Sequence, residues 1–152
     1  MPANATVMRT ALHTGLRIGD VLALKTEQLA PRFWITEAKT GKRRQVGLPK
    51  PLLAEIKAGA GDIWAFPGRD PTKHRTRQAV WHDVKRAAKL FRFKMNATPH
   101  SFRKLYAVRM LERTGDLEAV QKSLNHTFPS TTMIYAMANV FGRKKRKKKR
   151  KP

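Results

Sequence analysis

The chain has 152 residues, the size of one domain that is large enough to bury a hydrophobic core. It carries 33 Lys and Arg against 10 Asp and Glu, which gives a formal net charge of +23. A positive field of this size attracts polyanions, and nucleic acid is the usual one. The sequence contains no cysteine, which excludes disulfides and thiolate metal ligands, and no apolar run of membrane-spanning length.

The positive charge is concentrated at the C-terminal end. The last eleven residues, GRKKRKKKRKP, hold nine of the 33 basic side chains, and the rest of the chain keeps a net charge of +14 out of +23. A block of like charges cannot pack into a core. We therefore expect one folded domain over residues 1–141 and a basic, disordered tail over 142–152.

The first half of the chain predicts two short helices and a hairpin. The helices are expected over residues 4–13 and 18–24, with Thr14-Gly15 between them. Strands at 33–36 and 44–48 flank the turn Lys39-Thr40-Gly41-Lys42, where Gly41 is free to take a positive φ. A helix follows from Pro49 to about Lys57, and Ile63–Phe66 is expected to form a third short strand.

The second half predicts further helices, so the fold class is α+β, mainly helical, with a small antiparallel sheet at one edge. Residues 76–91 have an apolar stripe made of Ala79, Val80, Val84, Ala87, Ala88 and Phe91. Thr98 and Pro99 are suited to start a helix that runs to Arg113, and Asp116 caps another that runs to Leu124. Ser130 is expected to cap a last helix that carries Tyr135.

A set of basic side chains precedes a single tyrosine along the chain, and together they suggest a phosphate-binding pocket around a hydroxyl nucleophile. The order is Arg17, Lys39, His100, Arg103, His126 and Tyr135. Two guanidinium groups can bind the charge that develops on a phosphodiester during its cleavage. His100 and Arg103 are one helical turn apart, and Asp20 follows Arg17 by three residues and can orient it. Each residue alone is more often structural than catalytic.

The flanking residues make the set more specific. The segments TGLRIGDVLAL, AKTGKRR, PHSFRKLYA and LNH, followed by Tyr135, resemble the catalytic domain of the tyrosine recombinases, the phage integrase family, over residues 4–140. Asn125 stands where the family usually has glycine, a mild departure because asparagine also tolerates the left-handed conformation. Pro129 is less usual in this loop.

The resemblance implies a role for each residue of the set. Arg17 and Arg103 would bind the scissile phosphate, and Lys39 would protonate the leaving 5′-oxygen, with Lys42 as the reserve candidate. His100 would bind the phosphate or give acid–base help, and His126 would donate a hydrogen bond to a phosphate oxygen. Tyr135 would attack and form a 3′-phosphotyrosyl link. Further DNA contacts are expected from four basic residues: Lys42, Arg43, Arg44 and Lys104.

The resemblance also implies partners and a setting. The partner would be duplex DNA, bound by a tetramer on paired sites, with a monomer as the alternative for the isolated chain. No metal or nucleotide cofactor is expected, because the phosphotyrosine conserves the bond energy. The expected location is the bacterial cytoplasm, in a nucleoid-associated or phage-encoded protein. A nuclear location is the alternative if the tail acts as an import signal.

Two features depart from the family pattern. Family members usually carry an N-terminal domain that closes around the DNA, and this sequence starts at the catalytic part, which predicts weak, salt-sensitive binding. The basic tail has three interpretations: phosphate contacts, which we favour, an import signal, or an artificial extension.

Three other functions compete with a recombinase or integrase. They are a DNA-binding module with the same fold and no useful activity, a topoisomerase of type IB, and a basic RNA- or ribosome-associated protein.

Overall fold

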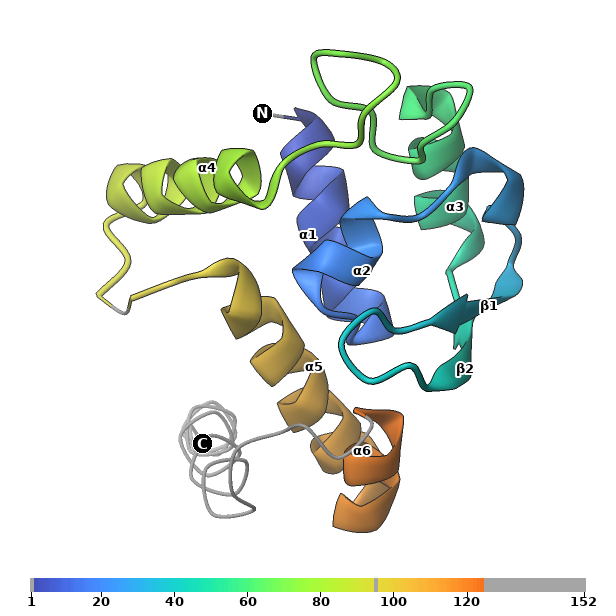
Figure 1. The fold of residues 1–152 in the computed structure, drawn as a ribbon. Helices are drawn as coiled ribbons and strands as arrows, with labels where there is room; N and C mark the ends of the chain where they lie inside the picture. The colour runs from blue at the N-terminus through green and yellow to red at the C-terminus, as the bar shows by residue number, and fades with distance from the viewer. Residues whose placement is uncertain (1, 95, 125–152) are drawn as a thin grey trace.

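The computed structural model describes residues 2–94 and 96–124, and its helices surround a central helix (Figure 1). This helix, α1 (Pro2–Thr14), contacts α2 (Ile18–Leu22), α3 (Lys50–Gly59), α4 (Arg77–Leu90) and α5 (Pro99–Thr114). Val7 and Ala11, one turn apart on α1, are almost completely buried in the main hydrophobic core. The helix predicted over residues 4–13 is therefore confirmed and forms part of the core.

A two-stranded antiparallel hairpin lies beside this helical core, as predicted. Strand β1 (Arg32–Thr36) pairs with β2 (Arg43–Gly47), and Phe33 stands opposite Val46. Both side chains are buried, as expected for alternate residues on the inner face of a strand. Gly41 in the connecting turn has a φ of 64°, which confirms the predicted left-handed conformation.

The predicted third strand at Ile63–Phe66 is wrong. This segment forms a single bridge, in which Thr26 N donates to Ile63 O at 3.0 Å and Ala65 N donates to Leu24 O at 2.9 Å. The pairing does not extend further because the segment opposite, after Lys25, forms a short 3₁₀ helix, η1 (Thr26–Gln28). Before this segment the chain makes a tight turn, in which Gly61 N donates to Trp64 O at 3.0 Å, and this turn limits the pairing at the other end.

Helix α4 follows its predicted stripe except at its end. The hydroxyl of Thr76 caps it by accepting from Ala79 N, and Val80 and Val84 are buried. Phe91, predicted to complete the stripe, is 70% exposed. The helix ends at Leu90, so Phe91 turns away from the core and borders an apolar groove of about 430 Å³ between α4 and α5.

The last described helices form a smaller core of their own. Helix α5 starts after a capping box made by Thr98 and Ser101, and it ends at Gly115 with a φ of 67°. Asp116 caps α6 (Leu117–Ser123) by accepting from Ala119 N. The buried residues between these helices are Ala107, Leu111, Val120 and Leu124. These helices were predicted within a residue or two, whereas the helix expected near Ser130 lies outside the described residues.

The predicted class, mainly helical with a small antiparallel sheet, is confirmed for the described part of the chain. None of the helices in residues 2–94 and 96–124 has the length and apolar character needed to cross a membrane.

Candidate active site

Arg17 stands at the start of α2, directly after a tightly packed turn. Gly15 has a φ of 66°, and a β-carbon added to it would lie 2.4 Å from Cδ1 of the Tyr106 ring. Leu16 is completely buried. The turn is therefore held on both sides of Gly15, and Arg17 leaves it in an extended conformation that precedes the helix.

Arg103 reaches the same turn from α5. Its side chain is only 2% exposed, and its guanidinium donates to Gly15 O at 2.8 Å and to Leu124 O at 2.9 Å. Burial, followed by the positive charge of Arg17, lowers the pKa of Arg103 to about 10, while Glu37 and Asp20 act in the opposite direction. Arg103 is therefore a fixed cation at neutral pH and a structural link between α6 and the turn.

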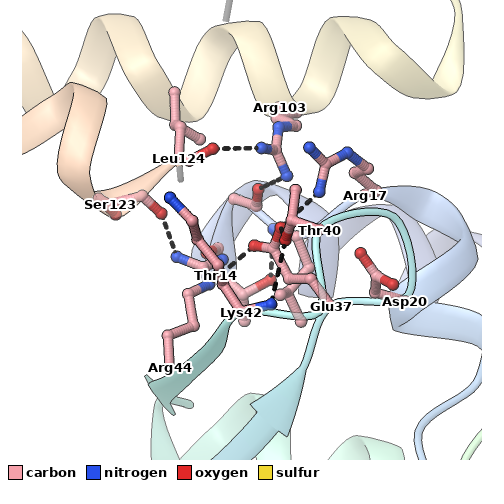
Figure 2. Close-up of polar contacts among 12 residues, drawn as sticks. Thr14, Arg17, Asp20, Glu37, Thr40, Lys42, Arg44, Arg103, Ser123 and Leu124 are labelled. Atoms are coloured by element: carbon pink, nitrogen blue, oxygen red, sulfur yellow. Dashed lines mark hydrogen bonds and ion pairs between the residues drawn. The ribbon is translucent and has the colours of Figure 1, made fainter. Parts of the chain in front are cut away.

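Arg44 of β2 makes a parallel set of contacts. It donates to Thr14 O at 2.8 Å and also to Ser123 O. Arg44 and Arg103 thus join consecutive carbonyl groups of the α1–α2 turn to consecutive carbonyl groups at the end of α6 (Figure 2). The sequence predicts Arg44 as a DNA contact, but the structure directs its guanidinium into the protein.

Glu37, which the sequence did not single out, lies among these arginines. Its side chain is completely buried, and its carboxylate pairs with Arg17 and lies 3.3 Å from Arg44 Nε. Glu37 is thus the carboxylate that the structure pairs with Arg17 (Figure 2). The predicted partner, Asp20, is buried and accepts a hydrogen bond from Ala38 N at 3.0 Å.

The hairpin turn presents the predicted lysines at the surface. Lys39 and Lys42 are exposed, and the turn is closed by a hydrogen bond from Gly41 N to Glu37 O at 2.9 Å. Arg43 is also exposed and places its guanidinium carbon 5.0 Å from the ring centre of Trp34. The stacked pair adds a surface cation next to the turn.

His100 lies on the first turn of α5, three residues before Arg103. Partial burial, together with the positive charges of Lys104, Arg103 and Arg17, lowers the pKa of His100 from its usual value of 6.5. The imidazole is therefore neutral at pH 7. The same charges show that His100 shares the electrostatic environment of the two arginines.

The structure thus brings Arg17 and Arg103 together, with His100 on the Arg103 helix and Lys39 on the hairpin turn that also holds Glu37. Lys104 is half-buried beside Arg103. The other two predicted catalytic residues, His126 and Tyr135, lie outside the described residues.

Known proteins match the part of the chain that contains the predicted site residues. The model of the phage integrase family matches residues 3–140. Tyrosine recombinase XerD of Rhizobium meliloti strain 1021 is 32% identical over 133 residues, which cover 80% of this chain and 43% of that protein. Tyrosine recombinase XerA of Pyrococcus furiosus is 31% identical over 132 residues, covering 80% of this chain and 46% of the relative.

Solved structures show the same fold at lower sequence identity. The XerH site-specific recombinase bound to its difH substrate superposes with a TM-score of 0.70 at 20% identity, over 89% of this chain and 42% of that one. A lambda integrase dimer bound to a COC′ core site gives a TM-score of 0.70 at 20% identity, over 90% and 52% of the two chains.

The matched residues cover less than half of the length of each of these two curated relatives. The family match nevertheless extends from α1 past the end of α6 and includes every residue of the predicted set. This protein therefore belongs to the phage integrase family, the tyrosine recombinases.

Proposed function

We propose that this chain is the catalytic domain of a site-specific recombinase or integrase, which cuts and rejoins duplex DNA through a 3′-phosphotyrosyl intermediate. The observation that carries the proposal is the convergence of Arg17 and Arg103 from distant parts of the chain onto one turn, around a buried carboxylate. A module that only binds DNA has no need of such a buried charge arrangement, because phosphate contacts at a surface suffice.

Each described residue has a chemical task in this proposal. Arg17 binds the non-bridging oxygens of the scissile phosphate, where negative charge develops in the transition state. Arg103 supplies a fixed positive charge at the floor of the site. Two of its five N–H groups are used on carbonyl oxygens, and the geometry of a guanidinium leaves others for the phosphate.

The bond changes balance as follows. The Tyr135 hydroxyl oxygen attacks phosphorus and gives its proton to neutral His100, the bond from phosphorus to the 5′-oxygen breaks, and Lys39 gives a proton to that oxygen. Neutral His100 is able to accept a proton or to donate one hydrogen bond, and His126 donates to a phosphate oxygen. A 5′-hydroxyl of a second DNA then reverses the step.

The remaining expectations belong to the same proposal. Residues 1–141 form the catalytic domain, and the tail at 142–152 contacts phosphates. Lys42, Arg43 and Lys104 contact duplex DNA near the site, while Arg44 supports the fold. The working assembly is a tetramer on paired DNA sites, in a bacterial cytoplasm, and the reaction needs no metal or nucleotide cofactor.

Covalent trapping tests this function. The chain is incubated with a library of nicked duplexes in EDTA, denatured in SDS, and examined for a protein–DNA band. The band is expected for the wild type, is expected to disappear in Tyr135→Phe, and identifies the DNA site when its DNA is sequenced.

The second tyrosine provides a matched control. The sequence contains only two tyrosines, and Tyr106 makes a hydrogen bond to Ser123 Oγ at 2.8 Å within the α5–α6 core. Tyr106→Phe should therefore keep the band. A wild-type chain that binds DNA and gives no band would contradict the proposal and favour the binding-module alternative.

A further inference from the structure

Glu37 is more deeply buried than Asp20, the other buried carboxylate near the site, and the proposed reaction assigns it no role. Its side chain has no exposed surface. An ionised carboxylate in this position is costly unless cations and hydrogen-bond donors compensate it. We infer that Glu37 is a positioning residue that fixes the guanidinium of Arg17 for phosphate binding, an inference that rests on the function proposed above.

The two carboxylate oxygens of Glu37 face different arginines. Oε2 accepts a hydrogen bond from Nη1 of Arg17 and another from the Thr40 hydroxyl at 3.3 Å. Oε1 lies 3.3 Å from Arg44 Nε, in an ion pair without hydrogen-bond alignment. Because Arg44 is itself held by Thr14 O and Ser123 O, the carboxylate is fixed on the side opposite Arg17.

The backbone of Glu37 adds a second constraint. Glu37 N donates to Lys42 O at 3.0 Å, and Glu37 O accepts from Gly41 N at 2.9 Å, so this residue closes the turn that carries Lys39. The same residue therefore helps to hold the turn and contacts the guanidinium of Arg17. Glu37 thus connects Arg17, which would bind the phosphate, with the turn that carries Lys39, which would protonate the leaving oxygen.

Orientation matters because a guanidinium is planar and binds phosphate oxygens with two parallel N–H groups. The side chain of Arg17 is 20% exposed, so it reaches the surface while Glu37 holds one of its nitrogens inward. A free arginine would sample several rotamers and would lose that geometry.

Charge compensation points the same way. Arg17, Arg44 and Arg103 approach one another, and Glu37 raises the pKa of Arg103 against the effects of burial and of Arg17. Removing the negative charge of Glu37 leaves these guanidinium groups to repel each other.

Glu37→Gln tests the inference, because it keeps the shape and removes the charge. We expect the single-turnover rate of covalent complex formation to fall about 10- to 100-fold, the effect of a misplaced catalytic group. The dissociation constant for DNA should stay near the wild-type value, because many surface phosphate contacts are unchanged. The alkaline limb of the rate profile should move to lower pH, since the pKa of Arg103 falls further below about 10.

Glu55→Gln is the matched control. Glu55 also pairs with an arginine, Arg9, but the two side chains are 37% and 53% exposed and lie on α3 and α1. This variant should cleave at the wild-type rate with an unshifted pH profile. Equal rates for Glu37→Gln and Glu55→Gln would overturn the inference.

Loss of folding is separated by a second variant. Glu37→Asp keeps the negative charge and withdraws it by one methylene, so it should retain the folded circular dichroism spectrum and the alkaline limb while the rate falls. A Glu37→Asp protein that cleaves at the wild-type rate would count against a positioning role.

A measurement without catalysis separates this inference from the proposed function. Nitrogen-15 NMR reports how fast the Arg17 guanidinium rotates about its Cζ–Nε bond. We expect faster rotation in Glu37→Gln and in Glu37→Asp than in the wild type or in Glu55→Gln. If the wild type forms no covalent complex, the proposed function fails. The rotation rate of the Arg17 guanidinium still tests the positioning role, and an unchanged rate in both Glu37 variants would overturn it.

Discussion

Arg103 has two tasks in one side chain, and this affects how substitutions at the site are interpreted. Its guanidinium donates hydrogen bonds to Gly15 O and Leu124 O inside the protein, and in the proposed function it also binds the scissile phosphate. Each hydrogen bond from a charged group contributes about 1.5–3 kcal/mol. An inactive Arg103→Ala protein would therefore report lost folding as readily as lost chemistry, whereas Tyr135→Phe changes one hydroxyl.

The protonation of His100 gives a prediction for a single residue. Burial is the main cause of its lowered pKa, and Lys104, four residues further along α5, is the next. Lys104→Met removes that positive charge, so the pKa of His100 should rise toward 6.5. A proton NMR titration of the imidazole ring measures the change directly.

The same shift has a consequence for stability. Because the pKa of His100 is lowered in the folded state, the unfolded chain binds the proton more readily. The free energy of unfolding should therefore fall as the pH drops below the usual value of 6.5. This fall should be smaller in Lys104→Met than in Lys89→Met, a control at an exposed lysine of α4. An identical His100 titration in both variants would contradict the assigned cause.

Residues with a motif were predicted from the sequence, and the residue without one was not. Arg17, His100 and Arg103 were found because their neighbours resemble a family pattern. Glu37 acquires its surroundings only when the hairpin packs against α1, α2 and α6. One local signal was available: residues 33 and 35 face the core, so residue 37 continues on the inner face, where a carboxylate requires a cation.

At the scale of elements, the turn between α1 and α2 gives a second prediction. Gly15→Ala should destabilise the fold in two ways. The left-handed conformation costs a non-glycine residue about 1–2 kcal/mol. The added carbon would also meet the Tyr106 ring at 2.4 Å, and overpacking of this kind costs about a further 1–3 kcal/mol. Chemical denaturation measures the sum.

Gly41→Ala isolates the backbone part of that cost. Gly41 has nearly the same φ, 64°, and a β-carbon added there would meet no atom within 4 Å in the described part of the chain. It should therefore lose only the conformational term, so Gly15→Ala should be clearly the less stable of the two. Equal stabilities would show that Tyr106 moves away without cost.

Elements with their own start and stop signals were predictable, and elements that depend on a partner were not. Thr76, Thr98 and Asp116 precede helices at the expected places because capping is local. The segment Ile63–Phe66 has strand composition, but a strand needs a partner of matching length. The segment opposite forms the 3₁₀ helix η1 instead of a strand, so only one bridge forms. Composition alone does not contain that information.

At the scale of the whole molecule, the site is assembled from segments far apart in the sequence. The α1–α2 turn, the hairpin, α5 and the end of α6 are joined by side chains of Arg44, Arg103 and Glu37 rather than by one element. The last described residue, Leu124, is one of the joined positions, and it precedes His126 by two residues. The fold thus fixes the point from which the segment with the proposed catalytic residues His126 and Tyr135 continues.

The distribution of charge over the whole chain gives the last prediction. A protein that neutralises phosphates releases counterions, and the slope of log affinity against log salt is about −0.9 for each phosphate on duplex DNA. If the nine basic residues of 142–152 contact phosphates, a chain that ends at residue 141 should bind random duplex less tightly and with a shallower slope. Fluorescence anisotropy at several salt concentrations measures both.

A matched variant distinguishes charge from length. Replacing the nine basic residues of the tail by serine keeps its length and removes its charge, so its slope should equal that of the shortened chain. The rest of the protein retains a net charge of +14 out of +23, so both variants should still bind DNA. A slope equal to the wild-type slope would show that the tail makes no phosphate contact. The import-signal and artificial-extension interpretations would then remain, because neither requires the tail to change the salt dependence of DNA binding.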